Sequence, residues 1–180
     1  GYTVSDEALK AGWGGVVVKT AFPHPEEMIK KGETPIHVPM DYMGYFGSET
    51  HGNCDNVSGH PLQLSADAVR RLKQKWGNTR ILAGSTGGPL GNEVCFSERP
   101  EMNGGKAGEP SKYFVDGCPC ARCGWRRNAA MLEDAGADFV EFSLSCPQGG
   151  EGGEGSIAGQ DPKTTRKIVE WVMSMERPEY

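Results

Sequence analysis

An uninterrupted apolar run at residues 15–18, Gly-Val-Val-Val, constrains the fold of this sequence more than any other feature. Strands with one face in water alternate apolar and polar residues, whereas strands buried on both faces read as continuous apolar runs. Residues 15–20 are therefore predicted to form a buried strand of a parallel sheet. The residues before them predict a short helix, with Ser5 as its cap and Gly12 as its end. Helix followed by buried strand is typical of α/β folds.

The same alternation continues along the chain. Further strands are predicted at 80–85 and 138–145, and two long irregular stretches occupy 21–64 and 86–124. Irregular connections of such length are usually functional. The remaining predicted helices are 65–77, with Ser65 as cap and Gly77 as end, 126–133, and 161 to about 175, with Asp161 as cap and Pro162 in the first turn.

Three strands of this kind fit part of a doubly wound sheet or part of a (β/α)8 barrel. In both architectures, reactive groups gather at the carboxyl ends of the strands. Lys19, Ser85 and residues 143–146 all fall at such ends. The sequence therefore predicts a functional site along one edge of the sheet.

Composition narrows the class of function. The 180 residues carry a formal charge of −5, which offers no basic surface for a nucleic acid. No segment approaches the roughly 20 consecutive apolar residues that span a bilayer. The first residues show no signal-peptide pattern, so we expect a cytoplasmic protein without a membrane partner. Because the sequence does not begin with Met, we expect a processed chain or a piece of a longer one.

Cysteines supply two candidate chemical centres. Cys146 follows a strand and precedes a proline and several glycines, a position that suits a nucleophile or proton donor, although a lone cysteine is often a small buried residue without a role. Lys19 ends an apolar strand, where an ammonium group is costly unless it meets a polar partner. A snorkelling lysine is the alternative.

The second centre is the Cys-x-Cys-x-x-Cys pattern of Cys118, Cys120 and Cys123. Three thiols so close in sequence can bind one metal centre, with Cys95 or Cys54 as the fourth ligand. An iron–sulfur cluster and a structural zinc ion both fit. Redox-active thiols and unconnected cysteines remain alternatives, while nothing in the sequence indicates the oxidising compartment that a disulfide needs.

Two motifs resemble a known family. Residues 136–149, Gly-Ala-Asp-Phe-Val-Glu-Phe-Ser-Leu-Ser-Cys-Pro-Gln-Gly, followed by Gly-Gln-Asp-Pro at 159–162, resemble the active-site strand and next helix of flavin-dependent dihydropyrimidine dehydrogenases. Residues 11–20 are similar to the second strand of the same dihydroorotate dehydrogenase-like FMN barrels. The resemblance implies that residues 1–180 are one partial (β/α)8 domain holding strands two to four. Residues 86–124 would form a cysteine-rich insertion after the third barrel strand, on the catalytic face.

The resemblance also implies roles for individual residues. Lys19 and Thr20 would contact the FMN ring, and Ser143 would contact it from the third strand of this chain. Cys146 would be the catalytic acid–base residue, exchanging a proton with the substrate while the flavin N5 atom exchanges a hydride.

Substrate contacts are implied for Asn56 and Ser145. The family usually has asparagine where this sequence has Ser143, and the shorter side chain cannot reach both flavin and substrate. A plain pyrimidine is therefore not assumed, and the substrate is expected to be a small cyclic, polar, pyrimidine-like molecule.

The implied activity is that of an FMN-dependent dehydrogenase or reductase acting on a C–C double bond. The cysteine-rich insertion departs from the family pattern, and we expect it to hold a 4Fe-4S cluster that delivers electrons to FMN or accepts them from it, with zinc as the alternative metal. The expected ligands are Cys95, Cys118, Cys120 and Cys123, and an electron-transfer partner is expected as well. The rest of the barrel would come from the same polypeptide or from a second chain. An alternative is an iron–sulfur or zinc-binding electron-transfer or structural subunit with a non-catalytic barrel.

Overall fold

A parallel sheet of three strands forms the centre of the computed structural model, which describes residues 1–22, 61–144 and 155–177. The strands lie side by side in chain order, and both neighbouring pairs are parallel. This confirms the prediction of successive parallel strands in an α/β fold. Their bounds are β1 Gly15–Ala21, β2 Ile81–Thr86 and β3 Phe139–Phe142.

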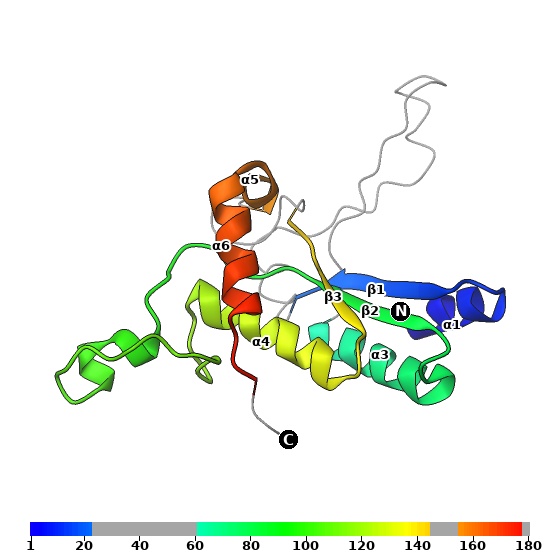
Figure 1. The fold of residues 1–180 in the computed structure, drawn as a ribbon, viewed down its shortest axis with the longest axis horizontal. Helices are drawn as coiled ribbons and strands as arrows, with labels where there is room; N and C mark the ends of the chain where they lie inside the picture. Colours follow the sequence, from blue (N-terminus) through cyan, green and yellow to red (C-terminus); the bar gives the residue numbers. More distant parts are fainter. Residues whose placement is uncertain (23–60, 145–154, 178–180) are drawn as a thin grey trace.

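Helices pack on one face of this sheet, with α1, α3 and α4 below the strands in the view of Figure 1. Helix α6 lies across α4, close to the end of β3, and a short helix α5 precedes it. Between β2 and α4 the chain extends away from the sheet and forms two 3₁₀ turns. The bounds are α1 Tyr2–Lys10, α3 Leu62–Trp76, α4 Ala121–Asp134, α5 Gly155–Gln160, α6 Pro162–Met173, and the 3₁₀ turns Phe96–Glu98 and Pro100–Met102.

The main core lies between the sheet and these helices. Val18 of β1 and Leu82 of β2 are buried against Leu72 of α3 and Leu132 of α4. Full burial of each such side chain contributes about 1.5–3 kcal/mol. At Gly84 a Cβ atom would lie 2.5 Å from a methyl carbon of Leu132, so only glycine allows α4 to approach β2 this closely.

The opposite face of the sheet carries exposed apolar side chains. Val17, Ile81 and Phe139 are 43%, 56% and 49% exposed, and each lies on the face that α3 and α4 do not cover. Ala83, which lies between Val17 and Phe139 in the register, is buried on this face. Large apolar side chains gathered on one exposed face can mark a contact with another part of a protein. This sheet is therefore consistent with part of a larger α/β architecture such as a barrel.

Helix starts depart from the sequence-based prediction in three places. Helix α1 begins at Tyr2 and α3 at Leu62, so Ser5 and Ser65 lie within the helices and do not cap them. Helix α4 begins at Ala121, five residues before the predicted start at 126, because the sulfur of Cys120 accepts a hydrogen bond from the backbone N–H of Cys123. A thiol is an uncommon cap, and the usual Ser, Thr, Asp and Asn pattern does not reveal it.

Other boundaries are confirmed. Gly77 ends α3 with a φ angle of 56°. The carboxylate of Asp161 accepts hydrogen bonds from the backbone N–H groups of Lys163 and Thr164, with Pro162 as the first residue of α6. The predicted strand at 138–145 is shorter and ends at Phe142.

Candidate functional site

The carboxyl end of β1 contains a β-bulge at two of the predicted cofactor-binding residues. Val18 pairs with Gly84 and Ala21 pairs with Thr86, so Lys19 and Thr20 together lie opposite one residue of β2. That residue is Ser85, which is buried. Bulges redirect side chains and are frequent beside active sites. Here the extra residue brings the Thr20 hydroxyl to 2.7 Å from the Ser85 hydroxyl.

Hydrogen bonds hold the three strand ends in register. The Ser65 hydroxyl of α3 donates to the carbonyl oxygen of Lys19 over 3.5 Å, and the Thr86 hydroxyl lies 3.1 Å from the carbonyl oxygen of Ala21. The backbone N–H of Ser143 donates to the carbonyl oxygen of Thr86 over 2.9 Å. The side chain of Lys19 is exposed at this edge.

The structure thus places Lys19 and Thr20 at the carboxyl end of β1 and Ser143 just after β3, on either side of the end of β2, and their roles stay predictions. Ser85, named at the sequence level only as a strand-end residue, and Thr86 complete this polar edge. Three predicted site residues lie outside the described residues. They are the predicted catalytic residue Cys146 and the predicted substrate-binding residues Asn56 and Ser145.

A second candidate centre forms where the chain between β2 and α4 meets the start of α4. We call Cys95, Cys118, Cys120 and Cys123 the four-cysteine cluster. All four residues are buried, and their sulfur atoms lie within 4.8 Å of one another. The Cys95 sulfur lies 3.4 Å from that of Cys123 and 3.8 Å from that of Cys118. Of the two fourth ligands left open by the sequence, Cys95 joins the cluster, and Cys54 lies outside the described residues.

Backbone N–H groups surround these sulfur atoms. Phe96 donates to the sulfur of Cys118 over 3.4 Å, and Val115 donates to the sulfur of Cys123 over 3.3 Å. The Cys120 sulfur accepts the capping bond already described, and the Cys95 sulfur accepts a hydrogen bond from the backbone N–H of Ser97. Such bonds stabilise thiolates more than thiols, because the acceptor carries the charge.

The thiol pKa values diverge within the cluster. Burial raises the pKa of Cys95, but hydrogen bonds from Ser97, Cys123 and Cys118 outweigh it and bring the pKa down to about 7. Burial raises the pKa of Cys120 and, more strongly, that of Cys123. Neighbouring thiols therefore compete for negative charge, which is the situation that a bound cation relieves.

Arg126 of α4 lies one helical turn after Cys123, the last cysteine of the cluster. Arg126 is buried and donates to the carbonyl oxygens of Trp171, Ser111 and Tyr113 over 2.6, 2.6 and 2.7 Å. Burial lowers its pKa, while the charges of the cluster sulfurs act to raise it. Among the described residues no salt bridge joins Arg126 to a carboxylate, so the guanidinium neutralises no acid there. The sequence pattern gives no sign of this arginine.

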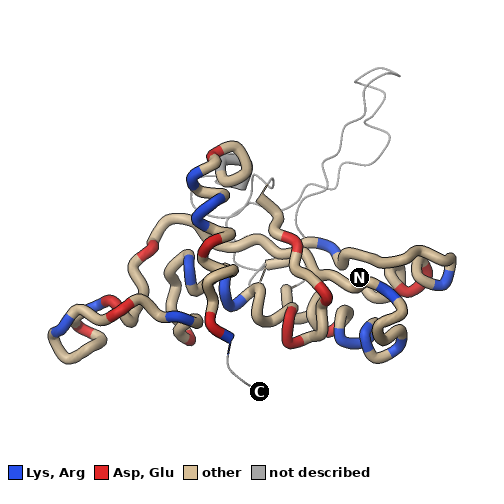
Figure 2. Tube along the Cα trace, viewed as in Figure 1, with Lys and Arg blue, Asp and Glu red and all other residues tan. Residues whose placement is uncertain are grey.

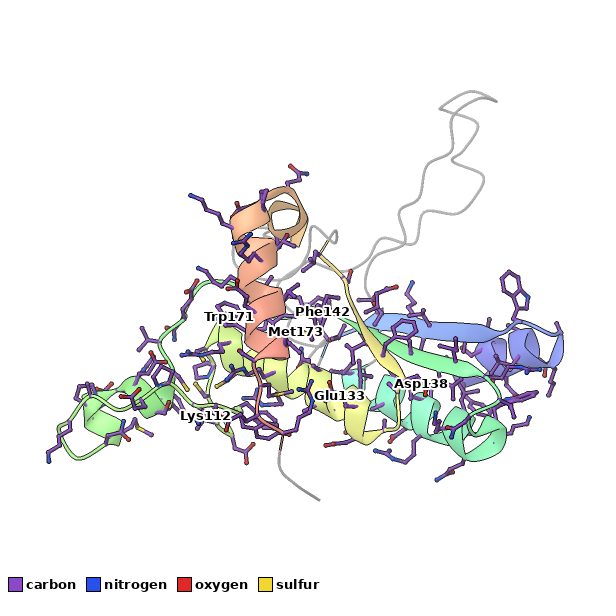
Figure 3. All side chains as sticks on the ribbon, in the orientation of Figure 1. Lys112, Glu133, Asp138, Phe142, Trp171 and Met173 are labelled. Atoms are coloured by element: carbon purple, nitrogen blue, oxygen red, sulfur yellow. The ribbon has the colours of Figure 1, made fainter. Side chains whose placement is uncertain are left out.

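One short segment links the strand edge to the cluster. The side chain of Asn128 donates to the carbonyl oxygen of Gly87 over 2.8 Å, and the indole N–H of Trp125 donates to that of Pro89 over 3.0 Å. A Cβ atom at Gly88 would lie 2.5 Å from the Trp125 ring. Helix α4 thus fixes the chain as it leaves β2. In Figure 3 Phe142 and Trp171 lie near this crossing of α4 and α6, and both pack against the cluster of apolar residues around Trp125.

The fold and the strand-end site define an α/β protein with a parallel sheet and polar residues at its carboxyl edge. The chain is 26% identical over 167 residues to the NAD-dependent dihydropyrimidine dehydrogenase subunit PreA of Escherichia coli strain K12, covering 92% of this chain and 31% of that protein. It is 22% identical over 174 residues to the chloroplastic dihydropyrimidine dehydrogenase (NADP(+)) of Arabidopsis thaliana, covering 95% and 34%. The chain thus spans about a third of the length of these relatives.

A shorter match bears the name of a different activity. One of the glutamyl-tRNA(Gln) amidotransferase subunits of Rhizobium etli is 28% identical over 121 residues, covering 61% of this chain and 24% of that protein. No family model matches the sequence. The chain is therefore distantly similar to dihydropyrimidine dehydrogenases over nearly its whole length, and this similarity agrees with the resemblance inferred from the motifs.

Within the part of the chain that the structure describes, no helix is both long enough and apolar enough to cross a membrane.

Proposed function

We propose that this chain is part of a flavin-dependent oxidoreductase that acts on a C–C double bond of a cyclic, polar, pyrimidine-like substrate. The observation that carries the proposal is the similarity to two dihydropyrimidine dehydrogenases over more than nine-tenths of the chain. The parallel sheet with polar residues gathered at its carboxyl edge supports it, because α/β enzymes place their chemistry there.

The residues at the strand edge suit an FMN ring. Lys19 supplies a positive charge for the electron-rich pyrimidine edge of the ring, and the bulge at β1 presents Thr20 beside Ser85. Ser143 would contact the ring from the end of β3. The chemistry that FMN supplies when bound is hydride exchange at its N5 atom.

Saturating a C–C double bond requires a hydride at one carbon and a proton at the other. In our proposal the Cys146 thiol holds that proton and delivers it to the substrate carbon, and in the reverse direction its thiolate removes it. Asn56 and Ser145 would bind the polar groups of the substrate ring and so orient the double bond toward Cys146. A positioned acid–base group of this kind contributes about 10²–10⁴-fold to rate.

The remaining barrel is part of the proposal. Residues 1–180 would supply strands two to four of a (β/α)8 barrel, with residues 86–124 as an insertion on its catalytic face. The exposed side chains of Val17, Ile81 and Phe139 would then face the barrel interior. The other strands, and an electron-transfer partner, would come from the same polypeptide or from a second chain.

Replacing Cys146 tests the proposed chemistry. The intact native protein should contain FMN and reduce or oxidise compounds in a panel of pyrimidines, dihydropyrimidines and related cyclic amides. Cys146→Ala should lower turnover at least 10²-fold while FMN content stays unchanged, because the residue moves a proton and does not hold the cofactor. Cys54→Ala is the matched control and should retain both. A native protein without flavin, or full turnover in Cys146→Ala, would contradict the proposal.

A further inference from the structure

We propose that the four-cysteine cluster binds a single, tetrahedrally coordinated zinc ion that locks the segment between β2 and α4 onto the start of α4. The inference is independent of the proposed flavin chemistry. It replaces an electron-carrying role for these cysteines with a structural one.

The spacing of the sulfur atoms favours one ion. Four thiolates at the usual Zn–S distance of about 2.3 Å, at the corners of a tetrahedron, lie about 3.8 Å from one another. The sulfur–sulfur separations of 3.4 and 3.8 Å in the structure, with all four sulfur atoms within 4.8 Å of one another, match this arrangement. In a 4Fe-4S cluster each thiolate binds a different iron, so the thiolates must stand apart by the width of the whole cluster. The four-cysteine cluster leaves room for one ion.

The coordination shell is closed. All four ligands come from the protein and all four are buried, and structural zinc sites have this composition, whereas catalytic ones keep a position open for water or substrate. Zinc does not change its oxidation state, so an ion in this shell carries no electrons. Binding displaces the remaining thiol protons into solvent and leaves four thiolates around the ion.

The charge pattern of α4 points to an anion at its first turn. A helix N-terminus carries partial positive charge, so basic residues are unfavourable there and favourable at the C-terminus. Helix α4 has the reverse pattern, with Arg122, Arg126 and Arg127 in its first half and Glu133 and Asp134 at its end. Figure 2 shows this as blue segments followed by red along the helix. Arg122 already pairs with the carboxylate of Glu98. Four thiolates around one Zn²⁺ have a net charge of −2, which offsets the helix dipole and the charges of Arg126 and Arg127.

The same residues show what the ion would hold in place. Arg127 donates to the carbonyl oxygens of Val115 and Cys118 over 3.1 and 3.0 Å. These hydrogen bonds hold the loop that carries the proposed ligand Cys118 against α4. Cys95, 23 residues before Cys118 in sequence, meets that loop through its sulfur contacts. The ion would therefore close the long loop from β2 to α4. Closing a loop of this length removes much of its conformational freedom in the unfolded chain.

Metal analysis of the intact native protein, purified without added metal, tests the assignment. We expect about one zinc per chain, no acid-labile sulfide, and, after exchange with Co²⁺, the visible absorption of a tetrahedral thiolate site. Four irons with sulfide per chain, or one iron in place of zinc, would overturn it. Because these measurements use the unaltered protein, they stand even where a variant does not fold, and FMN content is read separately.

Variants extend the test to the structural role. Cys120→Ser should reduce zinc to near zero and increase amide hydrogen exchange in the first turn of α4 and in residues 95–118. Cys120→His should keep zinc, because three thiolates and one imidazole also form a closed site. Cys54→Ser is the matched control and should change neither quantity. Retention of one zinc per chain in Cys120→Ser would contradict the ligand set.

Discussion

The carboxyl edge of the sheet and the four-cysteine cluster are joined by a few residues yet differ in the physical properties that bear on function. At the strand edge, Lys19 is exposed and Thr20, whose hydroxyl meets that of the neighbouring strand, is only partly buried. In the cluster, every cysteine is buried, and backbone N–H groups donate hydrogen bonds to sulfur atoms. An open edge can admit a cofactor and a substrate, whereas a closed shell can only hold what it already contains. The strand edge is therefore the candidate catalytic site, and the four-cysteine cluster is a candidate structural site.

Trp125 provides the most severe test of how far the two regions depend on each other. Its ring is buried against Gly88 and in edge contact with Phe142, with the two ring centres 5.7 Å apart, so it touches the exits of both β2 and β3. Trp125→Ala should lower the free energy of unfolding by about 3–5 kcal/mol through the cavity it leaves. Trp13, which is 67% exposed, provides the control, and Trp13→Ala should change stability by less than about 0.5 kcal/mol. Chemical denaturation measures the unfolding free energy of both variants. Equal losses in Trp125→Ala and Trp13→Ala would show that the packing of Trp125 does not stabilise the fold.

Arg126 sharpens the comparison on the side of the cluster. Arg126→Met removes hydrogen bonds to three backbone carbonyl oxygens and one positive charge that interacts electrostatically with the cluster. We expect a loss of about 1.5–3 kcal/mol in unfolding free energy, together with weaker metal retention against a chelator. The matched control is Arg70→Met, because the Arg70 side chain is exposed and pairs with the exposed Asp67. A loss of stability without any change in metal retention would show that the charge of Arg126 does not act on the cluster.

Thr20 provides the corresponding change at the open edge, with a smaller effect on stability. Thr20→Val keeps the shape of the side chain and removes its hydrogen bond to Ser85, so we expect a loss of about 0.5–1.5 kcal/mol. If the edge binds FMN, the fraction of protein carrying FMN should fall while zinc content stays constant. Thr79→Val, at an exposed turn after α3, should change neither. Loss of zinc in Thr20→Val would mean that the two regions are coupled more tightly than their contacts indicate.

What the sequence can predict follows the same division. The apolar run of β1 and the Asp161–Pro162 start of α6 depend on neighbours in sequence, and the structure confirms a parallel strand at the first and the helix start at the second. The predicted burial of β1 on both faces is not found in the described residues, since Val17 is 43% exposed. The bulge at Lys19 and Thr20 depends on the register with β2, which no local pattern encodes. The meeting of Cys95 with the other three cysteines likewise depends on tertiary structure, so the sequence leaves Cys54 as an equal candidate.

Side chains that act against the usual rules are the hardest to anticipate. Cys120 caps α4 through its sulfur, and Arg126 lies buried among carbonyl oxygens instead of pairing with an acid among the described residues. Cap preferences and hydropathy describe average environments. Both exceptions involve the four-cysteine cluster, Cys120 directly and Arg126 through the electrostatic influence of the sulfur atoms. A metal ion held by four thiolates would favour both.

The last prediction concerns the contact between α1 and α3 at Asp6, which is remote from both regions. It predicts how the stability of the fold changes in acid. Asp6 of α1 accepts hydrogen bonds from Lys75 over 2.8 Å and from the indole of Trp76 over 3.0 Å, and these interactions, Lys75 first, lower the pKa of Asp6 to about 2. A carboxyl group with a lowered pKa stabilises the fold fully above its ordinary value of 3.8, and this contribution is lost as the pH falls toward 2. Asp6→Asn should therefore flatten the fall in stability between about pH 4 and pH 2 and leave the slope near neutrality unchanged.

Thermal unfolding measured across this range, with Asp67→Asn as an exposed control, tests that expectation. Acid acts on the four-cysteine cluster by protonating thiolates, which bind protons far more tightly than a carboxylate does, so metal loss should precede the weakening of the α1–α3 contact as the pH falls. Metal loss and the weakening of the α1–α3 contact could instead occur at the same pH, both in the native protein and in Asp6→Asn. That result would show that the loss of stability in acid comes from the cluster alone. Separate steps, with only the lower one removed by Asp6→Asn, would assign each step to its own group.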